Sequence, residues 1–155
     1  MCRVEPTESE HLHHLFMDLV RAAGLLPDRT VPGHEVSMSQ AFALHELDTG
    51  TPLSQQELAD RLGLEKSSVS RMAAEMERKG LLVRERVAHD QRQYRLRLTE
   101  HGHAVHVGMA STFHDHFETW VATMTRAERE ALLTGLPALV RAIRQHAGRA
   151  VTDHS

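Results

Sequence analysis

The stretch SQQELADRLGLEKSSVSRMAAEMERKG, residues 54–80, decides the fold of this chain. Ser54 followed by Glu57 is a capping box, the sequence signature of a helix start. A helix that begins there and runs through Leu62 would be ended by the glycine that follows it. A second helix, over residues 66–79, would begin after a short turn. Two helices joined in this way have the dimensions of a helix-turn-helix unit.

The second predicted helix of this unit has an apolar side and a polar side. Its apolar residues recur at helical spacing and predict a buried stripe: Val69, Met72, Ala73 and Met76. The opposite side offers small hydroxyls and then a guanidinium group: Ser67, Ser68, Ser70 and Arg71. Serine hydroxyls and N-terminal amides suit phosphate groups, and an arginine can bond a guanine edge. We expect this polar side to contact DNA in the major groove.

The next stretch, RERVAHDQRQYRLRLT at residues 84–99, predicts two short strands around a polar turn. Tyr94, Leu96 and Leu98 alternate with Gln93, Arg95 and Arg97, so one face is expected to be apolar and the other basic. A basic hairpin beside a helix-turn-helix is a wing, and arginines at its tip, residues 88–92, suit a narrow minor groove. We expect Asp90 to accept a hydrogen bond that directs Arg92 or an arginine of the preceding helix.

Charge is distributed unevenly along the chain. The whole chain has 18 Lys and Arg against 21 Asp and Glu, a net charge of −3. Residues 54–97 hold ten of the basic and seven of the acidic residues, so this segment carries +3 and the remainder carries −6. Such asymmetry favours a middle segment that faces a polyanion.

Length and composition narrow the class of protein. The 155 residues are enough for one domain with a real core. No apolar run reaches the length needed to span a bilayer, the first residues lack the layout of a signal peptide, and the single cysteine allows no internal disulfide. We expect a cytoplasmic protein with no membrane partner.

Helical patterns also flank the central unit. They predict helices over residues 9–26, 37–48 and 99–124, and a last helix after Thr125 in which Pro137 would introduce a kink. The outer helices carry more large apolar residues than a small lobe can cover, so a partner surface is expected. The fold class predicted is mainly α with a small β wing, a winged helix-turn-helix with N- and C-terminal dimerisation helices.

These patterns predict three segments. They are an N-terminal tail and dimerisation helix over residues 1–36, a winged DNA-binding lobe over residues 37–99, and C-terminal dimerisation helices with a tail over residues 100–155.

The central region resembles the winged helix-turn-helix of the MarR family of bacterial transcriptional regulators. The segment DQRQYRLRLTEHG is similar to the family signature D-x-R-x-x-x-(aliphatic)-x-L-T-x-x-G, with these residues in place: Asp90, Arg92, Leu96, Leu98, Thr99 and Gly102. The segments SMSQAFALHEL and MTRAERE also look like family helices, so the resemblance covers about residues 37–144. It implies a homodimer that binds a pseudo-palindromic operator in double-stranded DNA. It also implies a repressor that a small ligand commonly releases.

The resemblance assigns roles to residues by position. The expected major-groove contacts are Ser67, Ser68, Ser70 and Arg71, and the expected minor-groove contact is Arg92. Candidates for contacts to the DNA backbone are Arg86, Arg95 and Arg97. An effector pocket between the dimer helices and the lobe could be lined by Phe16, Phe42, Met109 and Phe113, although ordinary core packing explains these residues more simply.

Two kinds of sensor are alternatives to a repressor that a small ligand releases. Peroxide-sensing relatives use a cysteine in the first helix, whereas Cys2 lies in a predicted tail without the setting that activates a thiolate. The thirteen histidines leave a metal-responsive regulator as an alternative. His11 and His14, His103 and His106, and the cluster at residues 114–116 are its candidate groups. Zinc-responsive relatives place their ligands at positions occupied here by Ala41, Phe42, Met109 and Phe113, so no metal ligand is assigned.

Other functional classes have less support. The segments HELDT and HEVSM lack the second histidine of a zinc-protease motif, and no glycine-rich phosphate loop is present, so we expect neither an enzyme nor a cofactor. A winged-helix module for protein contacts without DNA binding is the remaining alternative. Such modules tend to lack the wing-tip arginines and the open Ser/Arg side that this sequence has.

Overall fold

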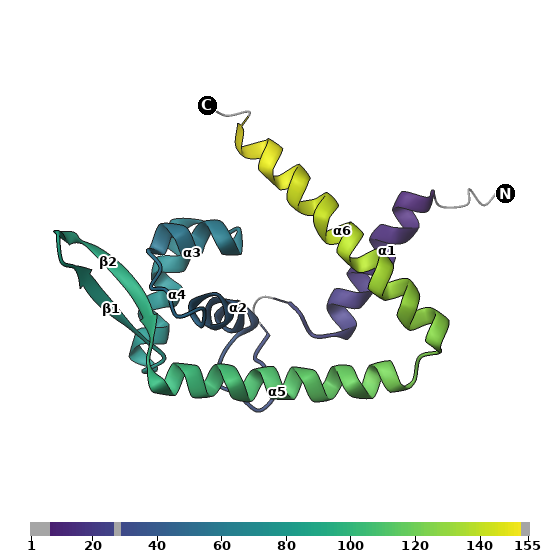
Figure 1. The fold of residues 1–155 in the computed structure, drawn as a ribbon, viewed down its shortest axis with the longest axis horizontal. Helices are drawn as coiled ribbons and strands as arrows, with labels where there is room; N and C mark the ends of the chain where they lie inside the picture. Colours follow the sequence, from purple (N-terminus) through teal and green to yellow (C-terminus); the bar gives the residue numbers. More distant parts are fainter. Residues whose placement is uncertain (1–6, 27–28, 153–155) are drawn as a thin grey trace. The chain divides into compact units, whose positions relative to one another are not determined.

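The computed structural model describes residues 7–26 and 29–152 (Figure 1). In chain order its elements are α1 (Glu8–Ala22), α2 (Met38–Leu47), α3 (Gln55–Leu62), α4 (Lys66–Arg78), β1 (Leu82–Val87), β2 (Asp90–Leu98), α5 (Glu100–Ala122) and α6 (Arg126–Thr152). The mainly α fold with a two-stranded wing is confirmed. The chain divides into two compact units between Ala110 and Ser111, inside α5.

Local capping signals set the helix starts. The predicted capping boxes at Ser37 and Ser54 are both formed, and each hydroxyl accepts the backbone N–H of the third helical residue. A further box at Thr7 begins α1. The first helix is shorter than predicted and ends at Ala22. Gly24 follows in the left-handed conformation with φ of 69°, a common way for a chain to leave a helix.

The first unit is built around the packing of α2, α3 and α4 with the base of the hairpin. Its largest fully buried side chains are Leu44, Leu58, Met76, Leu82, Leu96, Met109, Val31 and Val69. Of the predicted apolar stripe of α4, Val69, Ala73 and Met76 are buried, whereas Met72 is half-buried. The turn between α3 and α4 uses Gly63 at φ of 64°, as the sequence predicts.

The wing is an antiparallel pair anchored at its base. Leu82 pairs with Leu98, and Arg84 pairs with Leu96. Leu53, just before α3, extends the sheet edge, because its backbone N–H and carbonyl bond the carbonyl and N–H of Leu96 at 3.1 and 2.6 Å. The base of the wing is therefore fixed to the helix-turn-helix by both apolar packing and backbone hydrogen bonds.

The start of α5 lies tightly against the end of the α4–β1 connection. Thr99 accepts the backbone N–H of Gly102 through Oγ1 at 2.9 Å and so caps this helix, as predicted. A Cβ atom placed on Gly102 would lie 1.9 Å from the carbonyl oxygen of Leu81. No side chain fits at that distance, so this glycine of the family signature is required by close backbone approach.

The second unit consists of residues 111–122 of α5 together with α6. The helix α6 continues through Pro137. Both helices expose large apolar side chains, which are Phe117, Trp120, Val121, Leu132, Leu133, Leu136, Leu139, Val140 and Ile143. Within the described ranges, none of the helices combines the length and the hydropathy required of a membrane span.

Candidate nucleic-acid interface

The N-terminal part of α4 holds all four residues predicted for the major groove. Ser67 and Arg71 are exposed, and Ser68 and Ser70 are half-buried. Glu65 is the N-cap residue, but its side chain does not cap the helix, and no acidic residue occurs in the first turn. The first backbone N–H groups therefore keep the partial positive charge of a helix N-terminus, next to the two hydroxyls that precede Val69.

The tip of the wing is irregular. Pairing is regular up to Arg86 opposite Tyr94, and the next pair joins Val87 to Asp90. One step along β1 thus matches four along β2, and three residues of β2 bulge out between the two pairs. Arg92 is the middle one of these three residues, and it is exposed.

Asp90 stabilises the backbone of this bulge. Its Oδ1 accepts the backbone N–H of Arg92 at 3.0 Å, and its Oδ2 accepts Nε2 of Gln93 at 3.1 Å. A short carboxylate readily bonds the amide two residues on, as in an Asx turn. As expected, Asp90 is an acceptor for Arg92, but it accepts the backbone N–H of Arg92, and within the described ranges it bonds no arginine of α4. Asp90 shapes the tip and leaves the Arg92 guanidinium unengaged by it.

Two of the predicted backbone-contact arginines are held by carboxylates of the protein itself. Arg95 pairs with Glu57 of α3, and Arg97 pairs with Glu85 of β1, where Nε lies 2.9 Å from Oε1. The hydrogen bond from Arg97 lowers the pKa of Glu85 and, in turn, raises the pKa of Arg97. The pKa of Glu57 is lowered chiefly by the Ser54 backbone N–H, with Arg95 adding a smaller effect. The carboxylate already neutralises part of the positive charge of each of these two arginines, which weakens their attraction for another anion.

The remaining arginines are less engaged. Arg86 lies over the ring of Tyr94, with its guanidinium carbon 5.4 Å from the ring centroid. Arg71 and Arg92 form no ion pair with any carboxylate in the described part of the chain. No ion pair in that part of the chain holds these two guanidinium groups, and they are available to an external anion.

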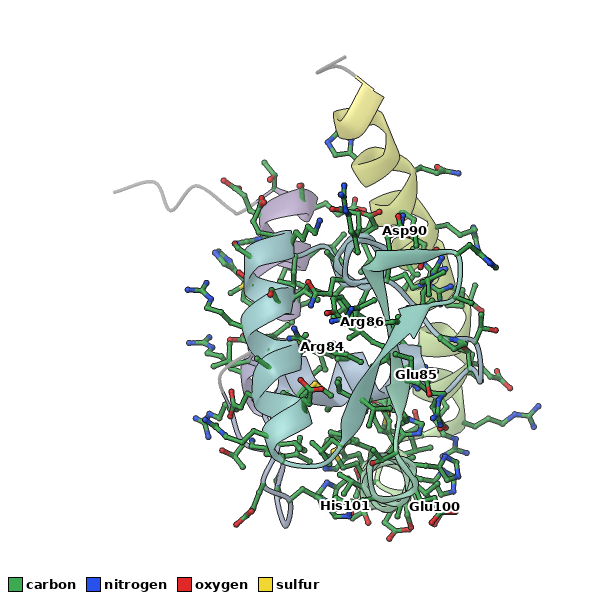
Figure 2. All side chains as sticks on the ribbon, turned by 90° about the vertical axis from the view of Figure 1, so that its left-hand side faces the viewer. Arg84, Glu85, Arg86, Asp90, Glu100 and His101 are labelled. Atoms are coloured by element: carbon green, nitrogen blue, oxygen red, sulfur yellow. The ribbon has the colours of Figure 1, made fainter. Side chains whose placement is uncertain are left out.

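Arg84 also belongs to the candidate interface, although the sequence patterns did not predict a role for it. Its Nη2 donates to the carbonyl oxygen of Ser70 at 3.3 Å, and its Nε lies 3.4 Å from Oε2 of Glu77. Figure 2 shows Arg84 directed towards α4, with Glu85 on the other side of the hairpin. This side chain joins the wing to the predicted recognition helix. The period-two pattern places residue 84 on the inner face, but the sequence does not indicate which α4 group it reaches.

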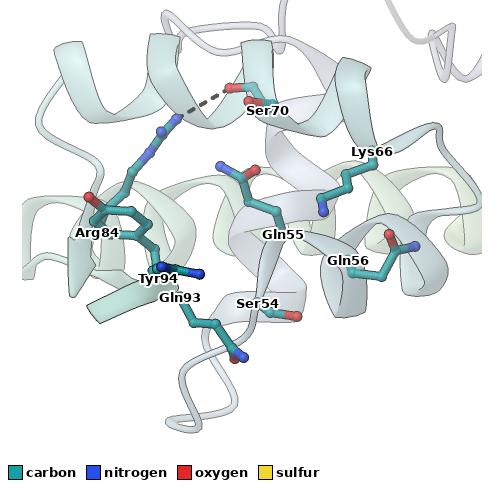
Figure 3. Close-up of a pocket in the computed structure, with 9 residues that line it drawn as sticks. Ser54, Gln55, Gln56, Lys66, Ser70, Arg84, Gln93 and Tyr94 are labelled. Atoms are coloured by element: carbon teal, nitrogen blue, oxygen red, sulfur yellow. Dashed lines mark hydrogen bonds between the residues drawn. The ribbon is translucent and has the colours of Figure 1, made fainter. Parts of the chain in front are cut away.

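A polar cleft of about 470 Å³ opens between α3, α4 and the wing (Figure 3). It is lined by Ser54, Gln55, Gln56, Lys66, Ser70, Arg84, Arg92, Gln93 and Tyr94. Three of these residues are cationic and none is acidic, so the cleft suits an anion. The cleft brings Ser70 and Arg92, which were predicted to contact DNA, together with Lys66, for which the sequence predicted no role.

The structure also describes most residues of the alternative sensor sites. Cys2 lies outside the described residues. In residues 7–26 and 29–152, no group of three or more His, Cys, Asp or Glu side chains is arranged to hold a metal ion. His103 and His106 both bond the carboxylate of Asp48 instead. Of the proposed pocket residues, Met109 is buried and Phe42 is exposed.

Comparison with known proteins points to one family. Residues 34–93 match the model of the MarR family. This matched segment contains α2, α3, α4, β1 and the tip of the wing.

Solved structures agree with the fold. A MarR family protein from Bacillus stearothermophilus is 19% identical and superposes with a TM-score of 0.76, covering 92% of this chain and 99% of that one. The PcaV transcriptional regulator from Streptomyces coelicolor, in complex with its natural ligand, is 25% identical with a TM-score of 0.70 over 92% of this chain and 99% of that one. Streptococcus pneumoniae FabT in complex with DNA is 19% identical with a TM-score of 0.70, over 88% of this chain and 95% of that one.

Proposed function

We propose that this chain, in which residues 34–93 match the MarR family model, is a transcriptional regulator that binds a specific sequence in double-stranded DNA as a homodimer. In this proposal residues 37–99 form the DNA-binding lobe. Residues 1–36 and 100–155 supply the dimerisation helices. The complex of FabT with DNA supports the same use of a similar fold.

The observation that carries the proposal is a cleft that is lined by cations and by no acidic side chain. Among the described residues, Lys66 and Arg92 of this cleft form no ion pair, and neither does Arg71 on α4. In a chain with a net charge of −3, this concentration of free positive charge is what a polyanion would select.

The geometry suggests a division of roles at the DNA. The open N-terminus of α4 with Ser67 and Ser68 suits a phosphate, and Ser70 and Arg71 one turn on suit base edges in the major groove. Arg92, held out by the bulge, suits the minor groove beside it. Arg86 is the stronger candidate for a backbone contact, because Arg95 and Arg97 are already bound to carboxylates.

Exposed apolar surfaces support the homodimer. The helix α1 buries none of its residues, and it exposes Leu12, Leu15, Phe16, Met17 and Leu19. The second unit exposes the apolar side chains of α5 and α6 named above, with Leu133 at 76%. Exposed apolar side chains in this number on a helix favour a partner, and a second copy of the chain is the simplest one. A two-fold dimer would place the two lobes about one duplex turn apart, roughly 10 bp.

We further propose that the protein acts as a repressor and that a small ligand releases it from DNA. The PcaV structure, which contains the natural ligand of that regulator, supports ligand binding by a similar fold.

The proposal is tested by gel shift and footprinting of the purified protein on the DNA that flanks its own gene. We expect one protected pseudo-palindrome and a loss of binding in the Arg92→Ala variant. The matched control is Arg126→Ala on α6, which removes the same charge from outside the lobe and should bind like the wild type. Equal binding to every duplex at every salt concentration would reject sequence-specific recognition, and no binding at all would favour a protein-contact module.

A further inference from the structure

A chain of hydrogen bonds joins the end of α2 to the start of α5. The carboxylate of Asp48, the C-cap residue of α2, accepts from Nδ1 of His103 at 2.6 Å through Oδ1 and from Nδ1 of His106 at 2.8 Å through Oδ2. On the far side of its ring, Nε2 of His106 lies 3.3 Å from Nδ1 of His45. These four side chains, which we call the His–Asp cluster, all lie in the first unit.

The cluster lies partly out of solvent. The side chain of His106 is 15% exposed and that of Asp48 is 22% exposed, whereas His103 is 61% exposed. The pKa of Asp48 is lowered, chiefly by the hydrogen bond from His103. Asp48 therefore stays ionised through the neutral range and acts only as an acceptor.

The hydrogen positions follow from that fact. Because an ionised carboxylate cannot donate, Nδ1 of both His103 and His106 must carry a hydrogen. A neutral His106 then has its lone pair at Nε2, so His45 must donate from Nδ1. If His106 takes a second hydrogen at Nε2, His45 can move its own hydrogen to the other nitrogen and accept. With one added proton on the pair, the hydrogen bond between His106 and His45 is therefore kept.

A second proton on the pair does not fit. With both rings charged, two N–H groups would face each other across 3.3 Å, and neither nitrogen could accept. Like charges at this distance repel, and partial burial of His106 strengthens the repulsion. The closed contact between His45 and His106 therefore requires that at least one of the two rings is neutral.

We propose that the His–Asp cluster is a proton-operated latch that ties α2 to the start of α5 near neutral pH and opens when both His45 and His106 are protonated. Histidine ionises around pH ~6.5, so opening is expected under mildly acidic conditions. The packing of α2 on α3, and of α3 on α4, connects the latch to the helix that we propose reads DNA. The inference rests on the proposed function for its effect on DNA, but the latch itself is a property of the free lobe.

Other charged groups on the neighbouring elements do not supply the same response. They are Glu46 of α2, which pairs with Arg61 of α3; Arg97 of β2, which pairs with Glu85 of β1; and Glu100 of α5, which lines a cleft with Asp48 and His103. Carboxyl groups ordinarily change charge near pH ~4 and guanidinium groups above pH ~12, so neither kind of group supplies a charge change near neutral pH. Imidazole is the kind of side chain whose charge ordinarily changes near neutral pH.

The first test uses the free protein, without DNA. Imidazole NMR signals are followed from pH 8 to 5 in the wild type, in His45→Gln and in a matched control, His114→Gln, whose ring is exposed on α5. Gln keeps an amide that can donate or accept but cannot be charged.

We expect His106 to titrate in two coupled steps in the wild type and in the control, and in one step in His45→Gln. We also expect the backbone amides of the first turns of α5 to lose protection against hydrogen exchange at pH 5.5, relative to their intrinsic exchange rates at that pH. This loss should occur only in proteins that keep His45. Independent single-step titration of His45 and His106 would overturn the proposal.

The second test measures affinity for the protected DNA fragment at pH 7.5 and 5.5. General protonation of the thirteen histidines adds positive charge and should strengthen DNA binding, whereas opening of the latch should weaken it. We expect the wild type to lose about fivefold in DNA affinity relative to His45→Gln between these pH values, at the lower end of typical allosteric couplings.

If His45→Gln and wild type respond alike, the latch does not control binding. If EDTA abolishes the wild-type response, the cluster is a metal site and the proposal fails. If neither protein binds DNA but the NMR titration is as expected, the latch stands and the proposed function fails.

Discussion

The guanidinium of Arg84 on β1 bonds the backbone carbonyl of Ser70 on α4 at 3.3 Å, which links the wing directly to the predicted recognition helix. This bond uses a carbonyl of the first half of α4, the part that holds the predicted base contacts. The wing and the helix therefore keep a fixed separation, and two neighbouring grooves of one duplex can be bound together only if that separation is kept.

Replacing this arginine should weaken DNA binding through the wing. We expect Arg84→Ala to cost affinity, and we expect the loss from Arg92→Ala to shrink in the Arg84→Ala background, with a coupling energy of about 1 kcal/mol. A double-mutant cycle by fluorescence anisotropy measures this coupling. Strictly additive losses would mean that Arg84 contacts DNA independently instead of positioning the wing tip. Arg84→Lys should recover part of the loss, since an ammonium can still reach the carbonyl.

The arginines of the wing should differ according to their internal partners. Arg92→Ala is expected to cost ~1–3 kcal/mol of binding free energy, and if it contacts a phosphate it should reduce the slope of log affinity against log salt by about 0.9. Arg97→Ala removes the same charge from a group that is bound to Glu85, and it should cost clearly less. A salt titration of both variants makes the comparison. Equal losses would show that ion pairing within the wing does not limit its contacts.

Adding one methyl group at Gly102 should destabilise the fold. A Cβ there would lie 1.9 Å from the Leu81 carbonyl oxygen, so the start of α5 has to move. We expect Gly102→Ala to lower the free energy of unfolding by about 1–3 kcal/mol or more, as overpacking does. Gly135→Ala in α6 is the matched control, because nothing lies within 4 Å of its Cβ position, and it should raise stability by ~0.5–1 kcal/mol. Denaturant unfolding of the two variants measures both effects.

The capping bond of α3 should make part of the stability depend on pH. The pKa of Glu57 is lowered in the folded chain, first by the Ser54 backbone N–H. The contribution of this carboxylate is therefore present above its unfolded pKa of ~4.3 and is lost as pH falls through the lower folded value. We expect Glu57→Gln to be less stable than the wild type at pH 7 and the difference to be smaller at pH 3. Urea unfolding at the two pH values checks the sign, and a difference that grows on acidification would contradict it.

A charge on the apolar side of α6 should weaken the proposed dimer. Leu139→Glu places a carboxylate among the exposed apolar residues, and we expect the dissociation constant of the dimer to rise at least about tenfold, or ~1.4 kcal/mol. Thr134→Glu adds the same charge on the same helix outside the apolar set. Sedimentation velocity over a range of concentrations compares the two. A monomeric wild type would reject the dimer outright.

Short-range patterns in the sequence were enough to predict the helix-turn-helix and its ends. The capping boxes at Ser37 and Ser54 and the left-handed Gly63 join groups at most four residues apart, so the same residues adopt the same structure in most surroundings. The apolar periodicity of α4 and the alternation of β2 are local in the same sense. The fold class and the position of the candidate site on α4 and the wing follow from such signals.

Only the tertiary structure decided which charged groups remain free. Glu57 and Arg95 are 38 residues apart, and Asp48 is 55 and 58 residues from His103 and His106. Whether such a pair meets depends on how whole helices pack, because a long side chain bonds whichever opposite group the fold brings within a few ångströms. For the same reason five wing arginines that look alike in the sequence have different partners, and the His–Asp cluster could not be predicted from two histidines at helical spacing. The sequence therefore determined the shape of the DNA-binding lobe, and packing determined which of its charges are available to a ligand.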